Sequence, residues 1–360
     1  MRPLAMVLLL GLAACGGGGA TPTPAPTPTA LPSPAAVGPE GWSLLTNSPQ
    51  SPARNRHDDI VFLDASRGWL VNVRGEVYGT QDGGQGWQKL STIEQPTFPR
   101  CVGFADAQHG WLGNLNTTAG SVQPDRSLFE TTDGGRSWTN ISTRITGAPV
   151  VGLCGMRVPG PGLVVAVGRW GGPPVFVKTT DGGRTWSARS LAPLATGLVD
   201  VFFFNERDGF AVGGLGVGYS EAEQRSSRTV VLGTHDGGAT WDTRYVSTAQ
   251  GQWAWKIHFV TDRVGFVTTE GPTPEGVVLK TLDGGSTWRP LPVAPGVSFE
   301  GVAFVDPDRG WVGSFDGLYA TSDGGANWHA LGYGFLVNRM RVVDAGLVYA
   351  TGDRVYRWTR

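Results

Sequence analysis

The sequence is constrained above all by an eight-residue pattern, Thr-x-Asp-Gly-Gly-x-x-Trp, that recurs six times. We call each copy a box, and the first runs from Thr80 to Trp87. Successive box Asp residues lie 40 to 55 positions apart. That period accommodates one four-stranded sheet per unit, as in propellers and solenoids. The recurring residues are Asp82, Asp133, Asp181, Asp236, Asp283 and Asp323, with Trp87, Trp138, Trp186, Trp241, Trp288 and Trp328.

A second pattern precedes the boxes and raises the number of units to seven. In it a Phe and a Gly lie six positions apart, with a turn-forming residue such as Asp64 between them. It predicts a strand, a tight turn and a second strand at the start of each unit. The third unit is degenerate, with Met156 and Gly162 at these places, and the pattern returns at Met340 and Gly346. The regular copies begin at Phe62, Phe104, Phe203, Phe259 and Phe304.

The two ends of the sequence predict how a ring of seven units closes. The segment 355–360 aligns with 77–82, which places it on the third strand of the seventh unit. Trp42-Ser43-Leu44-Leu45 has the Trp-x-x-Leu spacing that follows several boxes. We therefore expect the N-terminal segment to complete the last sheet, so that no edge stays open between the first and last units. The predicted fold is an all-β, seven-bladed propeller of four-stranded antiparallel blades.

The box has the composition of a structural turn. Its carboxylate can accept hydrogen bonds from the amides of the turn, its glycines adopt positive φ without steric cost, and its Trp can pack between adjacent sheets. One carboxylate per turn is too few oxygen ligands for Ca²⁺. We therefore predict no metal site in the boxes and no cofactor.

The first residues are typical of a lipoprotein secretion signal. A positive start and the apolar stretch from Leu4 to Leu12 precede Leu12-Ala13-Ala14-Cys15, which resembles a bacterial lipobox. We expect residues 1–14 to be a signal peptide, Cys15 to carry lipid, residues 15–40 to form a Gly/Thr/Pro-rich stalk, and residues 41–360 to form the propeller. An ordinary secretory signal is the alternative. The predicted location is extracytoplasmic and membrane-anchored, at the cell surface or in the periplasm, with the lipid as the only membrane contact.

The net charge of −1 gives no global attraction to nucleic acid, so we expect no nucleic-acid partner. Cys101 and Cys154 have opposite strand parity, as residues on the facing surfaces of adjacent sheets would. Either a disulfide between blades or two free thiols is compatible with this placement. We expect a monomer.

The repeated box resembles the Asp-box, or bacterial neuraminidase repeat, of sialidases, sortilin-type receptors, xyloglucan hydrolases and the photosystem II stability/assembly factor family. The last family fits best, because its members are similar in size and carry Phe-x-Asp-x-x-x-Gly-Trp-x-Val-Gly before the box, as in Phe304 to Gly313. The resemblance covers about residues 42 to 360. It implies a non-enzymatic scaffold that binds a membrane protein or its precursor during assembly.

Partner binding is expected on the face opposite the boxes, where longer loops at about 113–127, 213–229 and 268–276 gather. Cations and aromatic residues stand just before the innermost strands and can point at the axis. Arginines there suit carboxylates through paired hydrogen bonds, and the family resemblance implies an arginine patch with this use. The candidate partner-binding residues are Arg54, Arg56, Arg100, Trp253, Trp255, Lys256, Arg339 and Arg341.

A carbohydrate-active propeller is the alternative function, either a sialidase-like or other glycoside hydrolase or a glycan-binding lectin. Arg56, Arg100 and Arg341 could form the arginine trio of a sialidase, but no Tyr–Glu pair accompanies them. A two-carboxylate hydrolase could draw on Asp59, Asp200 and Glu300, and it needs two carboxyl groups about 5 to 9.5 Å apart. Asp59 and Asp200 are three units apart, so we expect the ring to separate them.

Overall fold

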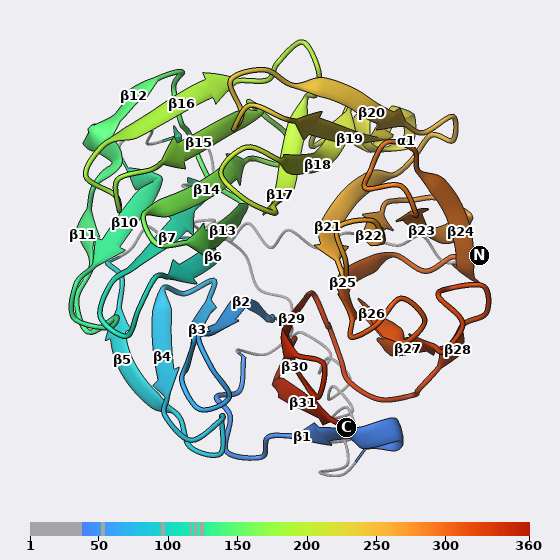
Figure 1. The fold of residues 1–360 in the computed structure, drawn as a ribbon, viewed down its shortest axis with the longest axis horizontal. Coiled ribbons are helices and arrows are strands. Elements are labelled where there is room, and N and C mark those ends of the chain that lie inside the picture. Colours follow the sequence, from blue (N-terminus) through green and yellow to red (C-terminus); the bar gives the residue numbers. More distant parts are fainter. Residues whose placement is uncertain (1–37, 52–54, 95–97, 116, 119–120, 123–125) are drawn as a thin grey trace, which may run out of the picture.

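The chain folds into seven β-sheets that are arranged side by side around a central axis (Figure 1). The computed structural model describes residues 38–51, 55–94, 98–115, 117–118, 121–122 and 126–360. Within them, the all-β seven-bladed propeller expected from the repeat is confirmed. The expected signal peptide, the lipidated Cys15 and most of the stalk lie outside the described residues. No helix in the described ranges has the length and apolar character needed to cross a membrane.

The first four blades follow the chain in order, each with its innermost strand first. Their strands are, for blade 1, β2 (His57–Phe62), β3 (Gly68–Asn72), β4 (Glu76–Thr80) and β5 (Gln88–Thr92); for blade 2, β6 (Pro99–Phe104), β7 (Gly110–Asn114), β10 (Leu128–Thr131) and β11 (Thr139–Asn140); for blade 3, β13 (Gly155–Gly160), β14 (Leu163–Gly168), β15 (Val175–Thr179) and β16 (Trp186–Ser190); and for blade 4, β17 (Gly197–Phe203), β18 (Gly209–Leu215), β19 (Arg228–Thr234) and β20 (Asp242–Val246).

The last three blades include the one that combines both ends of the propeller. Their strands are, for blade 5, β21 (Trp253–Phe259), β22 (Gly265–Glu270), β23 (Glu275–Thr281) and β24 (Arg289–Pro295); for blade 6, β25 (Phe299–Phe304), β26 (Gly310–Ser314), β27 (Gly317–Thr321) and β28 (His329–Ala330); and for blade 7, β29 (Arg339–Asp344), β30 (Leu347–Thr351), β31 (Val355–Thr359) and β1 (Trp42–Leu44).

The ring closes by the predicted pairing of the two ends. Strand β1 runs antiparallel to β31, with Trp42 opposite Trp358 and Leu44 opposite Tyr356. The indole of Trp42 also meets the edge of Trp311 in blade 6, at 5.5 Å between ring centroids. Trp42 and Trp358 are both buried. The first residues of the propeller therefore supply the outer strand of its last blade.

Each box forms a self-bonded turn. In the fifth box, Asp283 accepts hydrogen bonds from the Thr281 hydroxyl and from the amide and hydroxyl of Thr287. The bonds from Thr287 lower the pKa of Asp283 to about 2. Gly284 and Gly285 have φ of 71° and 83°, a region that side chains with a Cβ avoid. The other five boxes share the bond from the Thr hydroxyl, the bond from the amide four residues after the Asp and the two glycines at positive φ, but in the first box Gly86 has no side chain to add a bond.

The boxes and the turns between the first two strands share one face of the ring. The amide of Gly83 in the first box donates to the carbonyl of Ser66, which lies in the turn between β2 and β3, over 2.8 Å. The corresponding bond joins Gly134 to Gln108 in blade 2. Because the inner strands end at these turns, their first residues lie toward the opposite face. The longer loops and the start of every inner strand therefore share that face.

Boxes also join neighbouring blades. The carbonyl of the first box Gly accepts a hydrogen bond from the preceding blade at four junctions, in which the donors are the indole of Trp69, the ammonium groups of Lys178 and Lys280, and the hydroxyl of Tyr349. Each such bond crosses from one sheet to the next. A box therefore stabilises its own hairpin and the packing of its blade on the one before it.

Three local features differ from the expectations. Blade 3 has a fifth strand, β12 (Ile145–Gly147), which pairs parallel to β16. The loop expected at 268–276 is wrong, because β22 and β23 extend through it and leave only a short connection. The other two long connections carry a small hairpin of β8 (Thr117–Thr118) with β9 (Ser121–Val122), and helix α1 (Glu221–Ser226). Two 3-10 helices, η1 (Pro39–Gly41) and η3 (Ser142–Arg144), complete the elements described here.

Cys101 and Cys154 are buried and free, so no disulfide joins these two residues. A Cβ added at Gly113 would lie 2.4 Å from the sulfur of Cys101, which shows how closely this sulfur packs on blade 2. The sulfur of Cys154 instead accepts the amide of Trp170. Each sulfur is thus engaged in local packing.

Closure of the ring predicts energetic coupling between its two ends. Trp42→Ala and Trp358→Ala each remove a buried indole and should each lower the free energy of unfolding by about 3 to 5 kcal/mol. Since the two residues are paired across the seam, the double variant should show a coupling energy above about 0.5 kcal/mol in urea unfolding. The pair Trp358→Ala with Trp138→Ala in blade 2 is the control and should be additive. Additivity of the Trp42–Trp358 pair would contradict closure by this contact.

Candidate functional site

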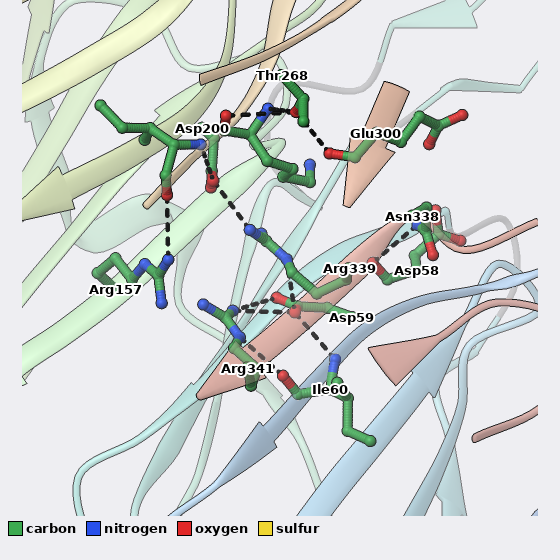
Figure 2. A network of polar contacts seen from close by, with 12 residues as sticks. Asp58, Asp59, Ile60, Arg157, Asp200, Thr268, Glu300, Asn338, Arg339 and Arg341 are labelled. Carbon is green, nitrogen blue, oxygen red and sulfur yellow. Dashed lines mark hydrogen bonds and ion pairs between the residues drawn. The ribbon is translucent and has the colours of Figure 1, made fainter. Parts of the chain in front are cut away.

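The centre of the ring holds a buried network of charged side chains (Figure 2). It arises because seven inner strands converge on one axis, so that residues at their starts are enclosed whatever their polarity. The members come from inner strands of several blades and include Asp58, Asp59, Asp200, Arg339 and Arg341. Burial of unpaired charge is costly, so the arrangement of partners determines the properties of this site.

One guanidinium bridges carboxylates from two distant blades. The Nη1 of Arg339 lies 2.9 Å from Asp200 in blade 4, and its Nε lies 3.0 Å from Asp59 in blade 1. The expectation that the ring separates Asp59 from Asp200 is therefore wrong, because both reach the same side chain at the axis. Burial alone would raise the pKa of Asp200, but the charges of Arg339, Lys256 and Arg157 outweigh it and lower this pKa. Asp200 is thus held as a carboxylate.

Asp59 and Asp200 each accept a backbone amide from the neighbouring blade. Asp59 accepts the amide of Val102 in the next blade over 3.0 Å, and Asp200 accepts the amide of Ile257 in the next blade over 3.3 Å. Asp59 additionally receives Nη2 of Arg341 at 2.9 and 3.0 Å from its two oxygens. These contacts make both carboxylates links between inner strands rather than free acids.

A second group of charges surrounds the indole of Trp255. The cationic groups of Arg56, Arg100 and Lys256 lie 5.9, 5.5 and 5.1 Å from its ring centroid, within the range of cation–π attraction. Arg56 pairs with Glu300, and Arg100 pairs with Asp58. Arg56 comes just before β2 and keeps 16% of its side chain exposed. We call Arg56, Arg100, Trp255 and Lys256 the Trp255 cluster.

Two members of this region have pKa values close to neutral pH. Burial, followed by repulsion from Glu300, raises the pKa of Glu270 to about 8. Burial, followed by repulsion from Arg339, lowers the pKa of Lys256 to about 7. Both groups can therefore change protonation state when a charge is added nearby. Sequence reasoning missed Glu270, because it ends the second strand of blade 5, where no repeated position drew attention to it.

Several buried polar atoms at the axis have no hydrogen-bond partner among the described residues. They include one carboxylate oxygen each of Asp58, Asp200, Glu270 and Glu300, and Nη2 of Arg339. Buried polar atoms in folded proteins are usually paired. The site therefore keeps unused donors and acceptors of both kinds.

Aromatic side chains extend this site toward the loop face at blades 3 to 5. Trp170 makes an edge contact with Trp253, at 5.6 Å between centroids, and another with Tyr219, at 5.1 Å. Tyr219 is 52% exposed, and its hydroxyl oxygen accepts a hydrogen bond from Nη2 of Arg169 over 2.8 Å. Trp170 and Tyr219 lie in loops between second and third strands, where the repeat provides no fixed pattern, so sequence analysis did not select them.

The structure separates the predicted partner-binding residues into three sets. Arg56, Arg100, Trp255 and Lys256 form the Trp255 cluster, Arg339 and Arg341 lie in the bridge between blades, and Trp253 joins the aromatic group. Arg54 lies outside the described residues. Within the ranges that the structure describes, no three His, Cys, Asp or Glu side chains are placed to hold a metal ion.

Comparison with known proteins gives a consistent set of relatives. The family model described as photosynthesis system II assembly factor YCF48 matches residues 225–334. A curated relative, the photosystem II assembly lipoprotein Ycf48 of Synechococcus sp. strain CC9902, is 26% identical over 287 residues, which are 75% of this chain and 73% of the relative. The chain resembles the Ycf48 assembly factors.

Solved structures show the same fold. The structure of YCF48 bound to D1 peptide superposes with a TM-score of 0.63 at 19% identity, covering 91% of this chain and all of that one. YCF48 from Cyanidioschyzon merolae gives a TM-score of 0.64 at 19% identity, over 89% of this chain and 99% of that one. A GH74 xyloglucanase from Xanthomonas campestris gives 0.59 at 14% identity, over 88% of this chain and 53% of the enzyme. At these identities the likeness concerns the fold.

The bridge through Arg339 predicts a large loss of stability that a second substitution partly restores. Arg339→Met leaves Asp200 buried without its ion pair and should lower the free energy of unfolding by about 3 to 5 kcal/mol. Adding Asp200→Asn removes the uncompensated charge and should restore part of this loss. Arg189→Met, which changes an exposed cation, is the control and should stay within about 0.5 kcal/mol of wild type. Urea unfolding measures all four proteins, and absence of any rescue by Asp200→Asn would refute the bridge.

The raised pKa of Glu270 predicts a pH dependence with a defined sign. The folded state favours the protonated carboxyl, so its contribution to stability is complete below the ordinary value of 4.5 and is lost as pH rises through about 8. Wild type should therefore lose free energy of unfolding relative to Glu270→Gln as the pH rises through about 8. Urea unfolding from pH 5 to 9 measures it. Glu275→Gln, at an exposed position of β23, should show no such trend.

Proposed function

We propose that this chain is a non-catalytic assembly factor that binds a segment of a membrane protein or its precursor. The observation that carries the proposal is the Trp255 cluster, in which three cations surround one indole on the loop face of a rigid ring. We further propose that Cys15 carries the lipid that tethers the chain outside the cytoplasm. The similarity to Ycf48 over three quarters of the chain supports this function.

The chemistry of the cluster suits a carboxylate-bearing segment. Arg56 and Arg100 present planar guanidinium groups, which can bind carboxylates through two parallel hydrogen bonds. Lys256 has a pKa of about 7, so an arriving anion can be balanced by protonation of Lys256 instead of by removal of Asp58 or Glu300. Binding of an acidic segment would then be accompanied by proton uptake near neutral pH.

A rigid scaffold also favours this use. The inner strands are tied together at the axis, and the boxes tie each blade to the preceding one, so the loop face is held in one shape before a partner arrives. A surface that is ordered in advance loses less conformational entropy on binding. YCF48 has been solved with a D1 peptide bound, and we propose a peptide segment of a membrane protein as the partner class here.

The carbohydrate-active alternative has one observation in its favour. Glu270 lies close enough to Glu300 for repulsion between the two to help raise the pKa of Glu270, and glycosidases use two neighbouring carboxyl groups of which one has a raised pKa. Both carboxyl groups are buried, however, and neither lines the grooves of about 320 and 340 Å³ that lie between blades 6 and 7 and between blades 1 and 2. Release of reducing sugar from xyloglucan by wild type, and its loss in Glu270→Gln, would favour this alternative.

The assembly-factor proposal predicts a partner that depends on the Trp255 cluster. Wild-type chain used as bait on detergent-solubilised membranes should retain one reproducible membrane protein, identified by mass spectrometry. The variant Arg56→Gln with Glu300→Gln, which removes a charge pair without leaving a buried charge, should reduce the retained amount at least about fivefold. Arg136→Gln with Arg184→Gln, which changes exposed cations on the box face, should not. Equal retention by both variants would refute binding at the cluster.

A further inference from the structure

One level of the ring axis receives two guanidinium groups from opposite sides of the ring. It lies two residues further along the inner strands than Asp59, Asp200 and Arg339, and therefore closer to the box face. Arg157 of blade 3 and Arg341 of blade 7 belong to this level (Figure 2). We call it the arginine level. Strand pairing places one residue of each blade there, namely Val61, Gly103, Arg157, Phe202, His258, Ala303 and Arg341.

The charges around the arginine level do not balance. Arg339 pairs with Asp59 and Asp200, and Arg341 pairs with Asp59. Arg157 forms no ion pair within the ranges that the structure describes. Three guanidinium groups therefore share two carboxylates, and the charge of Arg157 is left without compensation. Because an uncompensated charge in a protein interior is costly, an anion bound beside Arg157 would stabilise this site.

The contacts of Arg157 place its guanidinium near the axis. Its Nη2 reaches past blade 4 and donates to the carbonyl of Ile257 in blade 5 over 3.5 Å, and the group lies 5.7 Å from the ring centroid of Phe202. Burial, followed by repulsion from Arg341, lowers the pKa of Arg157 to about 9, so Arg157 stays charged at neutral pH. Its buried Nε has no hydrogen-bond partner among the described residues. A donor and a positive charge are thus both available.

Solvent reaches the arginine level from within the ring. Arg157, Phe202 and His258 each keep part of the side chain accessible. Nε2 of His258 lies 2.9 Å from the carbonyl of Phe304, and since a carbonyl only accepts, this nitrogen carries the proton. Burial, ahead of the charges of Arg157 and Arg341, lowers the pKa of His258 to about 4, so its imidazole is neutral at pH 7. His258 therefore adds no charge, but it can report on what enters this level.

An apolar collar lies between the arginine level and the box face. Its members stand two positions further along each blade, about 7 Å away at about 3.3 Å per residue, and their side chains share the parity of the arginine level. Phe204 packs edge-on against Phe259 of the next blade, at 4.8 Å between centroids, yet stays partly accessible. All seven members are apolar and at least partly exposed, namely Leu63, Ala105, Pro159, Phe204, Val260, Val305 and Val343.

The collar favours an alkyl chain over a peptide. Its side chains carry no polar atoms, and five of its backbone amides are bonded within their own turns, as Val305 is to the carbonyl of Arg309 over 3.1 Å. A peptide in the collar would lose water from its N–H and C=O groups and find no amide there to replace it. An alkyl chain has no such groups, and its burial against apolar side chains is favourable.

We propose that the ring binds an alkyl carboxylate, such as the anion of a fatty acid, with its carboxylate between Arg157 and Arg341 and its chain in the collar. Guanidinium groups suit this head group because they donate two parallel hydrogen bonds to a carboxylate. The ligand supplies the negative charge that the arginine level lacks. The site lies toward the end of the axis opposite the Trp255 cluster and does not rest on the function proposed above.

A series of linear carboxylates tests this site. The full chain is titrated calorimetrically with butanoate, hexanoate, octanoate and decanoate at neutral pH. Affinity should rise about fourfold for each methylene that the collar covers and level off once the chain extends beyond it. Labelling of the histidines with ¹³C gives a local readout, because the sequence has only five of them and the variant His258→Gln assigns the signal. The His258 signal should shift with the same saturation curve.

Matched variants separate the two parts of the site. Arg157→Gln removes the uncompensated charge without leaving a carboxylate unpaired, so it should fold normally and weaken octanoate binding at least about tenfold. Arg189→Gln, which changes an exposed cation on β16 of the same blade, should have no effect. Leu63→Asn in the collar should weaken binding several-fold, whereas Leu282→Asn, at another exposed leucine outside the collar, should not.

Three results would overturn the proposal for a carboxylate. They are the absence of saturable heat and of a His258 shift up to about 1 mM octanoate, equal binding of octyltrimethylammonium, and unchanged octanoate binding by Arg157→Gln. Tighter binding of an acetylated trivaline peptide than of octanoate would overturn the alkyl chain as the occupant, in favour of a peptide end.

Discussion

Enclosure of charge at the ring axis is the constraint on which the remaining features of this molecule depend. Inner strands that converge on one axis bury their first residues, and here many of those residues are ionisable. Buried charges are tolerated only when they are paired, so Arg339, Asp59 and Asp200 tie three blades together. The same enclosure moves the pKa values of Glu270 and Lys256 toward neutrality. The pairing of buried charges at the axis and the near-neutral pKa values of Glu270 and Lys256 thus have the same origin, namely burial.

The boxes provide the rigidity that such a site needs. Each box bonds internally through its Asp, and its glycines allow the turn to approach the preceding blade. At four junctions the link is a hydrogen bond to the carbonyl of a box glycine. The proposed partner site at the Trp255 cluster therefore lies on a scaffold whose shape is set before a partner arrives.

The sequence was informative where structure repeats and uninformative where it does not. Six boxes, five Phe–Gly copies and two Met–Gly copies were enough to predict the number of blades, and the spacing around Trp42 was enough to predict closure. Strand β12 was missed because a parallel strand at the outer edge of one blade leaves no periodic signal. The bridge was missed for a geometric reason, since separation by three units along the ring says nothing about how far a long guanidinium side chain reaches across its centre.

At the candidate site, too, some residues could be selected from the sequence and others could not. Arg56, Arg100 and Arg341 were selected because the sequence placed them just before inner strands. That placement is right for Arg56 and wrong for the other two, since Arg100 lies within β6 and Arg341 within β29. Their ion-pair partners could not be assigned without knowing which side chains face each other. Glu270, Trp170 and Tyr219 lie at a strand end or in loops of variable length, where position along the sequence carries little information about neighbours. Their roles follow only from the arrangement in space.

Pairing of β1 with β31 also has a consequence for the order of events during biosynthesis. Of the propeller strands, the outer strand of the last blade leaves the ribosome before all others and its partner β31 after all others, with more than 300 residues between Trp42 and Trp358. The nascent chain can build six blades while this early segment waits without a partner. The ring can therefore close only after β31 has left the ribosome, and until then the outer edge of β31 and the early segment lack their native pairing.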